Sequence, residues 1–363
     1  MKNVLIVGNG SIGITGNSKF YINNHTGYFL RNLNKQYSVT FTQGSSTYDK
    51  NNNLQNFELK KNKIEYRVLP KTKEKGFFSA VYKLLKTNDF IYLFYPGTVS
   101  KVFGLFAILI NKPFGLYIRG QNYKQNFLDR LILKNTKFIL TVSPLFADDL
   151  NKYCSKIAVI KPMIDIERDD LKRDRIFFNR NKKNLLFVGR VEVRKGIYEL
   201  LEIAQELKKN QLDFNLHIVG GGDLFHSLKS KILTMGISSN IVMHGLVSDK
   251  SKLKKLYDTA DVFVFTSYDE GFPRVLYEAM ASALPIFTTF VGGISGRMNH
   301  LGNCIEIPVK DGITSAQIIS KYIIDYSTLE FIGRNGQKTI EHIIDGSLLN
   351  HEELLIKELY NEE

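Results

Sequence analysis

The sequence predicts an α/β protein of two domains, each built around a parallel sheet. The chain has 363 residues, more than one hydrophobic core usually holds, and suits two domains of about 150–200 residues each. Short apolar runs alternate along it with longer segments of helical periodicity, which is the pattern of βαβ units. The alternation stops at a polar, charged stretch and then restarts, so a linker is expected at residues 163–184.

The first half begins with a short apolar run that ends in glycines, and four further apolar runs follow. The strands expected there are residues 4–7, 37–42, 90–95, 114–118 and 137–142. Residues 102–110 form the longest uninterrupted apolar run, but a helix that crosses a bilayer needs about 20 such residues. We interpret this run as a buried helix of the first domain, with contact with a membrane surface as the alternative.

The second half alternates strand and helix more regularly. The expected strands are residues 185–188, 214–219, 240–243, 261–265 and 285–288, and the expected helices are residues 197–209, 223–235, 250–259 and 274–283. Residues 346–363 carry leucines at helical spacing and predict a final helix. We therefore expect a first domain over residues 1–165, against which the final helix packs, and a second domain over residues 166–345.

The composition is that of a globular protein. Apolar residues make up 44% of the chain and charged residues 23%, which argues against disorder, a collagen-like repeat or a disulfide scaffold. Cys154 and Cys304 lie far apart and outside any CxxC motif, so they are expected to be reduced thiols. The N-terminal residues lack the apolar segment of a signal peptide, and we expect a soluble, cytoplasmic protein.

Charge is distributed unevenly between the two halves. Residues 1–165 contain 24 Lys and Arg against 9 Asp and Glu, a net charge of +15, whereas residues 166–363 contain 25 against 27, a net charge of −2. A basic domain suits an anionic surface, such as lipid headgroups, nucleic acid or a phosphorylated substrate. The alternative is that the lysines only solvate this half.

A GxGxxG motif follows the first expected strand, at residues 8–13, and includes Gly10 and Gly13. Its literal interpretation is a dinucleotide site, but such a site needs an acidic residue about 20 positions later to bind a ribose. Residues 23–25 are Asn, Asn and His, which argues against an NAD-dependent oxidoreductase. The glycines are expected either to let backbone N–H groups approach a phosphate or sugar, or only to form a tight turn between strand and helix.

Cations and glycines stand at three successive strand ends of the second half. Gly189 and Arg190 follow the first strand, and Lys195 precedes the next helix. Gly221 follows the second strand and His244 the third. Ligands bind open α/β sheets at these carboxyl ends, where Arg190 can form paired hydrogen bonds with phosphate oxygens and Lys195 can add a point charge. The alternatives are ordinary surface charges and a packed histidine.

Two carboxylates flank the start of the helix that follows the fourth strand. Glu270 precedes Gly271, Phe272 and Pro273, and Glu278 lies about two turns later. Pro273 suits the first turn of a helix. Carboxylates accept hydrogen bonds from sugar hydroxyls, and N–H groups near Gly271 and Phe272 suit a diphosphate. The alternatives are a solvated helix face for Glu278 and a helix N-terminal acid for Glu270.

These four segments, in this order and each at a strand end, resemble the retaining, family 4 type of GT-B glycosyltransferases. The resemblance covers nearly all of residues 185–310, including a Gly-Gly at 292–293, and is weaker over residues 1–165. It implies two Rossmann-like domains that face each other across a cleft, with a nucleotide sugar bound mainly by the second domain. It implies catalytic roles for Arg190, Lys195 and Glu270. The donor-binding positions that it implies are Gly10, Gly13, Arg119, Gly189, Gly221, His244, Gly271, Phe272 and Glu278.

No cofactor and no metal are expected. The sequence has no clear DxD motif, and the Asp-Ile-Glu at residues 165–167 is interpreted as a hinge. Arg190 and Lys195 can stabilise the negative charge that grows on a leaving diphosphate, so they can replace a divalent ion.

The sequence departs from the family pattern at three places. Many members have a histidine near the donor sugar where this chain has Arg119, and arginine cannot act as a base. Because Arg119 follows a buried-looking strand, it is expected to need a partner. The linker lacks an Asn-Gly before Asp165, and residues 295–297 are Ser, Gly and Arg where a glutamate often stands. Because of these departures, the sequence does not predict which sugar the donor carries.

The expected function is transfer of a hexose-type sugar with retention of configuration, without a covalent intermediate. The acceptor is expected to be a glycan or a polyprenyl-diphosphate-linked glycan, in the synthesis of a bacterial surface polysaccharide such as capsule or lipopolysaccharide. Peripheral contact with the anionic inner membrane fits the basic first half. A nucleotide-sugar epimerase on the same fold is one alternative. Nucleic-acid binding by the basic half is another, but no aromatic-interleaved basic motif or recognition helix supports it.

Overall fold

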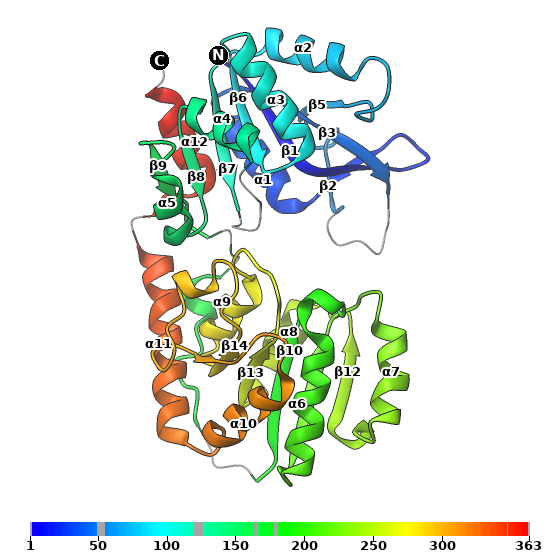
Figure 1. The fold of residues 1–363 in the computed structure, drawn as a ribbon, viewed down its shortest axis with the longest axis vertical. Helices are drawn as coiled ribbons and strands as arrows, with labels where there is room; N and C mark the ends of the chain where they lie inside the picture. The colour runs from blue at the N-terminus through cyan, green and yellow to red at the C-terminus, as the bar shows by residue number, and fades with distance from the viewer. Residues whose placement is uncertain are drawn as a thin grey trace. The chain divides into compact units, whose positions relative to one another are not determined.

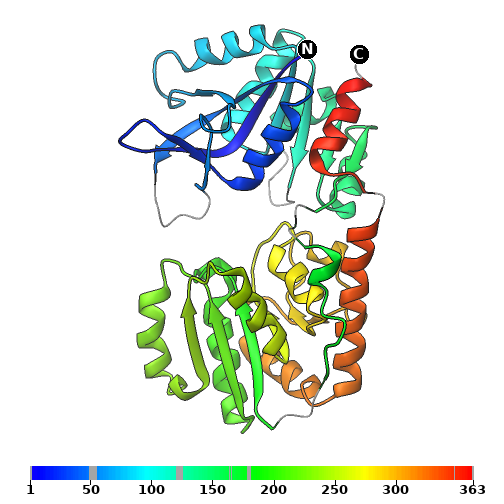
Figure 2. The ribbon, with the colours of Figure 1, turned by 180° about the vertical axis from the view of Figure 1, so that it is seen from behind.

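The computed structural model describes residues 2–48, 55–119, 126–162, 164, 166–177, 181–346 and 348–361 (Figures 1 and 2). The chain folds as two compact α/β units. Unit 1 consists of residues 1–163 and 348–363, and unit 2 of residues 164–347. The sequence places the boundary after residue 165, which lies outside the described residues, as do residues 163 and 178–180 of the expected linker.

Unit 1 contains a nine-stranded sheet in the order β4-β2-β1-β6-β7-β8-β9, with β3 paired to β1 and β5 paired to β3. The strands are β1 (Asn3–Ile14), β2 (Phe20–Ile22), β3 (Ser38–Thr47), β4 (Phe57–Glu58), β5 (Glu65–Val68), β6 (Phe90–Tyr95), β7 (Phe114–Ile118), β8 (Ile139–Thr141) and β9 (Ile157–Val159). All five expected strands are present. The pairings are parallel except those of β2 with β1 and β4, and sequence periodicity did not indicate these short additions.

The helices of unit 1 pack against both faces of this sheet. They are α1 (Asn24–Leu33), α2 (Phe77–Thr87), α3 (Thr98–Leu109), α4 (Phe127–Asn135), α5 (Pro144–Leu150) and α12 (His351–Tyr360). The apolar run at residues 102–110 lies in and just after α3. The run is helical, as predicted, but only one side of α3 is buried.

The GxGxxG motif at residues 8–13 is part of a strand, not a turn before a helix. β1 continues to Ile14, with a register shift against β3 between Val7 and Ser11, and then pairs with β2 in a hairpin. A Cβ on Gly8 would lie 2.0 Å from Oε1 of Gln43, and one on Gly13 would lie 2.3 Å from Oε1 of Gln55. These two glycines therefore make room for glutamine side chains. The expected turn is wrong, and no helix N-terminus follows it to bind a pyrophosphate.

The last helix, α12, returns to unit 1 after the whole of unit 2. Leu354, Leu355 and Leu359 join the buried core of this unit, and Figure 2 shows red α12 beside blue α1. His351 is buried at the first position of α12, where its Nε2 lies 2.7 Å from the hydroxyl of Tyr92. Burial, and secondarily the charge of Arg119, lowers the pKa of His351 to about 3, so the imidazole is neutral.

Unit 2 contains a six-stranded sheet in the order β12-β11-β10-β13-β14-β15, with every pairing parallel. The strands are β10 (Lys183–Val188), β11 (Phe214–Val219), β12 (Ile241–Gly245), β13 (Val262–Phe265), β14 (Ile286–Thr288) and β15 (Ile305–Glu306). The helices are α6 (Ile197–Lys209), α7 (Phe225–Thr234), α8 (Lys250–Thr259), α9 (Arg274–Ala281), α10 (Gly312–Tyr322) and α11 (Tyr326–Asp345). Single 3-10 turns lie at Arg168–Asp170, Val193–Lys195, Ser238–Asn240 and Ile294–Gly296.

The sequence predicted β10 to β14 and α6 to α9 with ends that differ from the structure by at most two residues. Their apolar side chains form one continuous buried core.

The strand order of unit 2 reverses between β10 and β13. The chain runs from β10 outward through β11 to β12, and then crosses back to β13 on the other side of β10. In open parallel sheets, such a reversal opens a crevice at the carboxyl ends of the two central strands, because their connections leave in opposite directions. The loops that follow β10 and β13 therefore border the ligand position that this topology favours.

Candidate functional site

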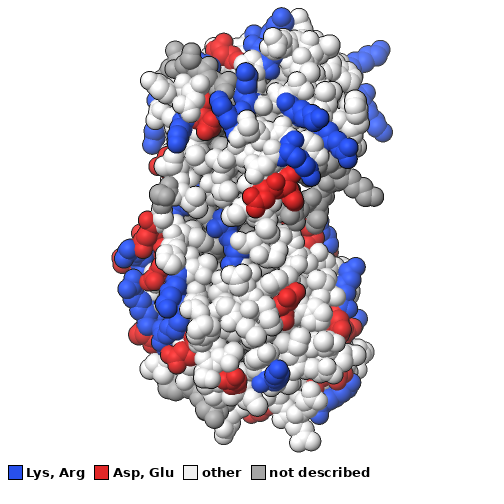
Figure 3. Space-filling view, turned by 60° about the vertical axis from the view of Figure 1, so that its left-hand side comes forward, with Lys and Arg blue, Asp and Glu red and all other residues white. Residues whose placement is uncertain are grey.

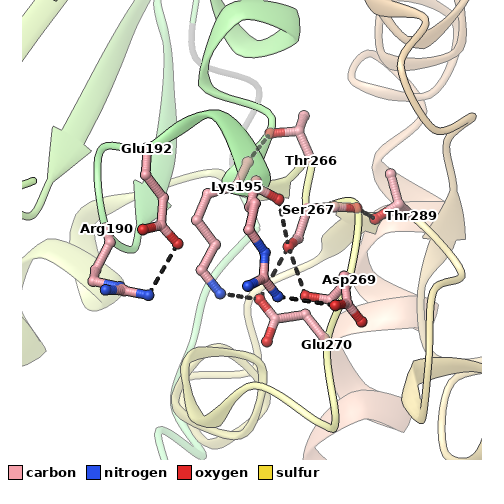
Figure 4. Close-up of polar contacts among 9 residues, drawn as sticks. Arg190, Glu192, Lys195, Thr266, Ser267, Asp269, Glu270 and Thr289 are labelled. Carbon is pink, nitrogen blue, oxygen red and sulfur yellow. Dashed lines mark hydrogen bonds and ion pairs between the residues drawn. The ribbon is translucent and has the colours of Figure 1, made fainter. Parts of the chain in front are cut away.

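The loops after β10 and β13 are joined by an ion pair between Lys195 and Glu270 (Figure 4). The lysine side chain is 20% exposed and the glutamate side chain 12%, so both are largely shielded from water. Arg190 is 70% exposed and lies 3.1 Å from a carboxylate oxygen of Glu192. An ion pair this exposed is weak, so Arg190 can leave Glu192 for a stronger anionic partner.

The loop after β10, which we call the cationic loop, spans residues 189–196, and its backbone is fixed by the loop after β13. Gly196, which follows Lys195, has a φ of 66°, and a Cβ there would lie 2.0 Å from the carbonyl oxygen of Thr266. The hydroxyl of Thr266 lies 3.0 Å from the carbonyl oxygen of Lys195 and 2.9 Å from that of Gly196. Only glycine fits this approach, and the contact sets the place from which the Lys195 side chain extends.

Glu270 is held by its side chain and by its backbone. The buried hydroxyl of Ser267 lies 3.0 Å from Oε1 of Glu270, nearer than the backbone carbonyls that it also faces. Gly292 has a φ of 59°, and a Cβ there would lie 1.7 Å from the carbonyl oxygen of Glu270. The Gly293 N–H donates to the carbonyl of Gly271 at 2.8 Å. The carboxylate therefore has a defined orientation before any ligand binds.

A second pair links the same two loops at the surface. Arg194 lies 2.9 Å from a carboxylate oxygen of Asp269, and the Tyr268 N–H donates to the Arg194 carbonyl, also at 2.9 Å. The Thr289 hydroxyl donates to the carbonyl of Ser267 at 2.6 Å. Sequence reasoning singled out none of these residues, although Ser267 and Asp269 flank a strand end where ligands commonly bind.

Glu278 lies in α9 and is oriented by a buried tyrosine of α8. The hydroxyl of Tyr257 donates to Oε2 of Glu278 at 2.7 Å. Burial, and secondarily the charge of Glu278, holds the pKa of the Tyr257 phenol well above its ordinary value, so it remains a donor. Pro273 caps α9 rather than standing in its first turn. The ring of Phe272 packs against that of Tyr277, with centroids 4.4 Å apart.

The glycine turn after β11 packs directly on the cationic loop. Gly220 has a φ of 138°, and a Cβ there would lie 1.8 Å from the carbonyl oxygen of Gly189. The Val191 N–H donates to the carbonyl of Gly221 at 2.9 Å. The structure therefore brings Gly189, Arg190 and Gly221 into one set of adjoining loops.

His244 forms a pair with another histidine. Its Nε2 lies 2.9 Å from Nδ1 of His217, and the two rings stack. Burial lowers the pKa of both, and the neighbouring His244 lowers that of His217 further. Within the described ranges, His244 is therefore a partly buried side chain whose neighbour is another histidine.

The remaining predicted site residues, Gly10, Gly13 and Arg119, belong to unit 1. Gly10 is exposed in β1, and a Cβ there would meet only Gln43, at 3.7 Å. Arg119 follows β7 and is exposed, with its guanidinium 6.0 Å from the centre of the Tyr117 ring. Because Arg119 is exposed, its charge keeps its hydration, and the Tyr117 ring is the contact that the structure gives it.

No cluster of three or more His, Cys, Asp or Glu side chains suited to a metal ion occurs within the described ranges. The loop after β10 does contain three cations, namely Arg190, Arg194 and Lys195. Each pairs with a carboxylate, and two of the three are mostly exposed. This arrangement can accept a ligand with several negative charges, which would compete with the carboxylates for the same cations.

Residues 168–339 match the family model of the glycosyl transferases group 1. An uncharacterized glycosyltransferase of Methanocaldococcus jannaschii is 32% identical over 160 residues, which are 44% of this chain and 40% of the relative. The capsular polysaccharide biosynthesis glycosyltransferase CapM of Staphylococcus aureus is 30% identical over 176 residues, which are 48% of this chain and 45% of the relative. The chain thus spans less than half the length of these curated relatives.

The whole chain is similar in fold to solved glycosyltransferase structures. HepE of Anabaena, solved in complex with UDP, superposes with a TM-score of 0.72 at 16% identity, and each chain is covered completely. The fold is therefore that of the GT-B structures, with two Rossmann-like α/β units, as the sequence predicted.

Proposed function

We propose that this chain, whose residues 168–339 carry the group 1 glycosyltransferase domain, is a retaining, metal-independent enzyme of the family 4 type. It would move a hexose-type sugar from a nucleotide-diphosphate donor to a glycan. The observation that carries the proposal is the Lys195–Glu270 ion pair at the strand-order reversal of unit 2. A cation and a carboxylate fixed side by side suit a ligand that combines a diphosphate with a polyhydroxylated sugar.

Lys195 and Arg190 would bind the donor diphosphate. Their present partners are carboxylates, which a diphosphate of higher charge can displace. As the bond between the anomeric carbon and the phosphate oxygen breaks, negative charge grows on that oxygen. Fixed cations aimed at it lower the barrier, and the backbone contacts of Lys195 with Thr266 keep its side chain in place.

The two glutamates would bind the two hydroxyl-bearing parts of the donor. Glu270, oriented by Ser267 and Lys195, would accept hydrogen bonds from the transferred sugar. Glu278, oriented by Tyr257, would accept them from the ribose. The cations follow β10, and both glutamates follow the neighbouring strand β13. Gly189, Gly221, Gly271 and Phe272 would line the same ligand.

Retention follows in this proposal from attack on the face that the diphosphate leaves. The acceptor oxygen bonds to the anomeric carbon while the bond to the phosphate oxygen breaks. The acceptor proton goes to the leaving phosphate oxygen, so no covalent enzyme intermediate forms and no side chain acts as a base. Gly10, Gly13 and Arg119 of unit 1 are further donor contacts in this proposal.

The relatives support a polysaccharide setting. CapM is named for capsular polysaccharide biosynthesis, and HepE was solved with UDP, so a UDP-sugar donor is the first to test. The acceptor would be a glycan or a polyprenyl-diphosphate-linked glycan at the cytoplasmic face of the inner membrane. No helix in the described part of the chain has the length and apolarity needed to cross a membrane, and we propose peripheral contact through basic unit 1.

The test begins with binding of UDP, GDP, ADP, CMP and NAD, followed by thermal unfolding. A ligand of the folded state raises the melting temperature, and we expect a shift with one nucleoside diphosphate that Arg190→Ala and Glu278→Ala reduce. The matching nucleotide sugar is then supplied with EDTA present, and proton NMR reads the configuration of the new glycosidic bond. Binding of NAD alone, loss of activity on chelation, an inverted product, or isomerised donor without a glycoside would each contradict a named part of the proposal.

A further inference from the structure

Helix α3 has an apolar outer side as well as an apolar inner side. Ser100, Phe103, Gly104 and Ala107 are buried against unit 1. The opposite side carries Val102, Leu105 and Phe106, which are partly buried, and Leu109, which is 79% exposed. A surface helix of a globular protein normally carries polar residues on its outer side, and a helix that is apolar all round contacts something further.

Helix α2 extends this apolar surface. Phe78 is 56% exposed and Tyr82 is 47% exposed, one helical turn apart on the same side of α2. The ring of Phe78 stacks on that of Phe106 of α3, with centroids 5.8 Å apart, and the two helices lie side by side in cyan in Figure 1. We call this surface the α2–α3 face; its residues are Phe78, Tyr82, Val102, Leu105, Phe106 and Leu109. Contiguous exposed apolar patches mark interaction sites, whereas single exposed residues do not.

The charges around the α2–α3 face are almost all positive. Residues 70–112 contain seven lysines and two acids, Glu74 and Asp89, and neither helix contains an acid. Lys83 and Lys86 are exposed on α2 itself, and Nζ of Lys86 lies 5.6 Å from the centre of the Tyr82 ring. On the side of the molecule drawn in Figure 3, Lys and Arg predominate over unit 1, whereas both signs are mixed over unit 2.

We propose that the α2–α3 face docks on the surface of an anionic lipid bilayer. Exposed aromatic and aliphatic side chains flanked by lysines suit the boundary between headgroups and acyl chains, where both kinds of group gain contacts. Lys101 of α3 pairs with Asp129, but α2 has no acid beside Lys83 and Lys86, so a second copy of the chain would bring these lysines opposite one another, which opposes self-association. Nucleic acid would satisfy the lysines but leave Phe78 and Leu109 in water. Of these three occupants, the bilayer complements both features.

This inference specifies the surface for the peripheral contact proposed above and does not depend on sugar-transfer chemistry. The chain contains no tryptophan, so Phe78→Trp introduces a single fluorescent reporter at the centre of the face. With vesicles of phosphatidylcholine and phosphatidylglycerol, we expect a blue shift of its emission and co-sedimentation of the protein. Vesicles of phosphatidylcholine alone should give a much smaller effect. Raising the salt concentration well above about 0.1 M should weaken binding, because the lysine attraction is screened.

Leu233→Trp in α7 of unit 2 is the matched control, because Leu233 is 71% exposed and should show no shift. The doubly substituted Lys83→Glu, Lys86→Glu variant should lose at least about tenfold in vesicle binding, whereas Lys229→Glu, Lys338→Glu, the same charge change in unit 2, should not. Both pairs should keep the nucleotide-induced thermal shift of the wild type, which shows that they fold. Equal shifts of the two reporters, wild-type vesicle binding by the α2 variant, or a dimer that Phe78→Asp dissociates would overturn the proposal.

Discussion

In each unit the first apolar run of the sequence is followed by glycines, and these glycines have different structures in the two units. In unit 1 the strand continues through the glycines to Ile14, and the space beside Gly8 and Gly13 is filled by Gln43 and Gln55. In unit 2 the strand ends at Val188, and the chain turns away into the loop that carries Arg190 and Lys195. The comparison teaches that a glycine motif after an apolar run can lie within a continuing strand or open a loop, and the sequence pattern alone does not separate the two cases.

The largest expected effect tests the loop of unit 2. Lys195→Ala removes the shielded cation, and kcat should fall by roughly 10²–10³-fold, the usual effect of losing one group that stabilises transition-state charge. The rate of nucleoside diphosphate release from the donor measures it. Lys229→Ala in α7 serves as the control and should change little. A loss of less than about tenfold would mean that the cation is not aimed at the leaving group.

The second effect is a pH dependence of the unfolding free energy that we expect for His351 of unit 1. The pKa of His351 in unit 1 is lowered to about 3 by burial, against about 6.5 in an unfolded chain. Above pH 6.5 both states are neutral, and below it only the unfolded state gains a proton. Stability is therefore lost as the pH falls, by about 2 kcal/mol between pH 6.5 and pH 5.

Urea unfolding across this pH range, with the two units resolved by fluorescence or by hydrogen exchange, measures that loss. The half-buried His217–His244 pair makes unit 2 change in the same direction. His351→Phe should flatten the pH dependence of unit 1 and leave that of unit 2 intact. If the unfolding free energy of unit 1 depends on pH equally in the wild type and in His351→Phe, other titratable groups cause the effect.

The third effect compares neighbouring glycines of β1. Gly8→Ala places a Cβ 2.0 Å from the Gln43 side chain and should destabilise the fold by about 1–3 kcal/mol through overpacking. Gly10→Ala meets nothing closer than 3.7 Å and should change stability by less than about 0.5 kcal/mol. Denaturant midpoints measure both. Loss of donor affinity in Gly10→Ala, with stability unchanged, would show that unit 1 also uses this glycine for a ligand.

The smallest effect concerns the orientation of Glu278. Tyr257→Phe removes the hydrogen bond that the Tyr257 hydroxyl donates to the carboxylate and should raise the KM for the donor roughly 5- to 10-fold, about 1 kcal/mol, with kcat nearly unchanged. Tyr360→Phe, at an exposed tyrosine of α12, is the control. A fall in kcat as large as the expected rise in KM would mean that Tyr257 stabilises the transition state and not only the bound donor.

Regular elements of unit 2 were predictable because each strand and helix carries its own periodicity. The bounds of α6 and α8 agree with the sequence prediction at both ends. The continuation of β1 was not predictable, because its alternation of Gly with Asn, Ser and Ile also suits a loop. β2 and β4 have three and two residues, too few for a periodic signal.

The charged side chains of the candidate site were identified from their positions at strand ends, whereas the hydroxyls that orient them were not. Tyr257 lies 21 residues before Glu278 in another helix, and its hydroxyl becomes relevant only when α8 and α9 pack together. Ser267 is close to Glu270 in sequence, but serine is common in turns, so its type alone carries no information on what it contacts. Arg119 was expected to need a partner because it follows a buried strand, but the buried residues of β7 end at Ile118 and Arg119 is exposed.

The return of α12 to unit 1 determines the order in which a ribosome can complete the two folding units. All strands and helices of unit 2 lie between residues 168 and 345, so its core can close while synthesis continues. The core of unit 1 also requires His351, Leu354, Leu355 and Leu359. A nascent chain paused before these residues would contain a complete unit 2 and an incomplete core of unit 1. Premature stop codons between residues 346 and 351 should therefore damage the domain encoded first.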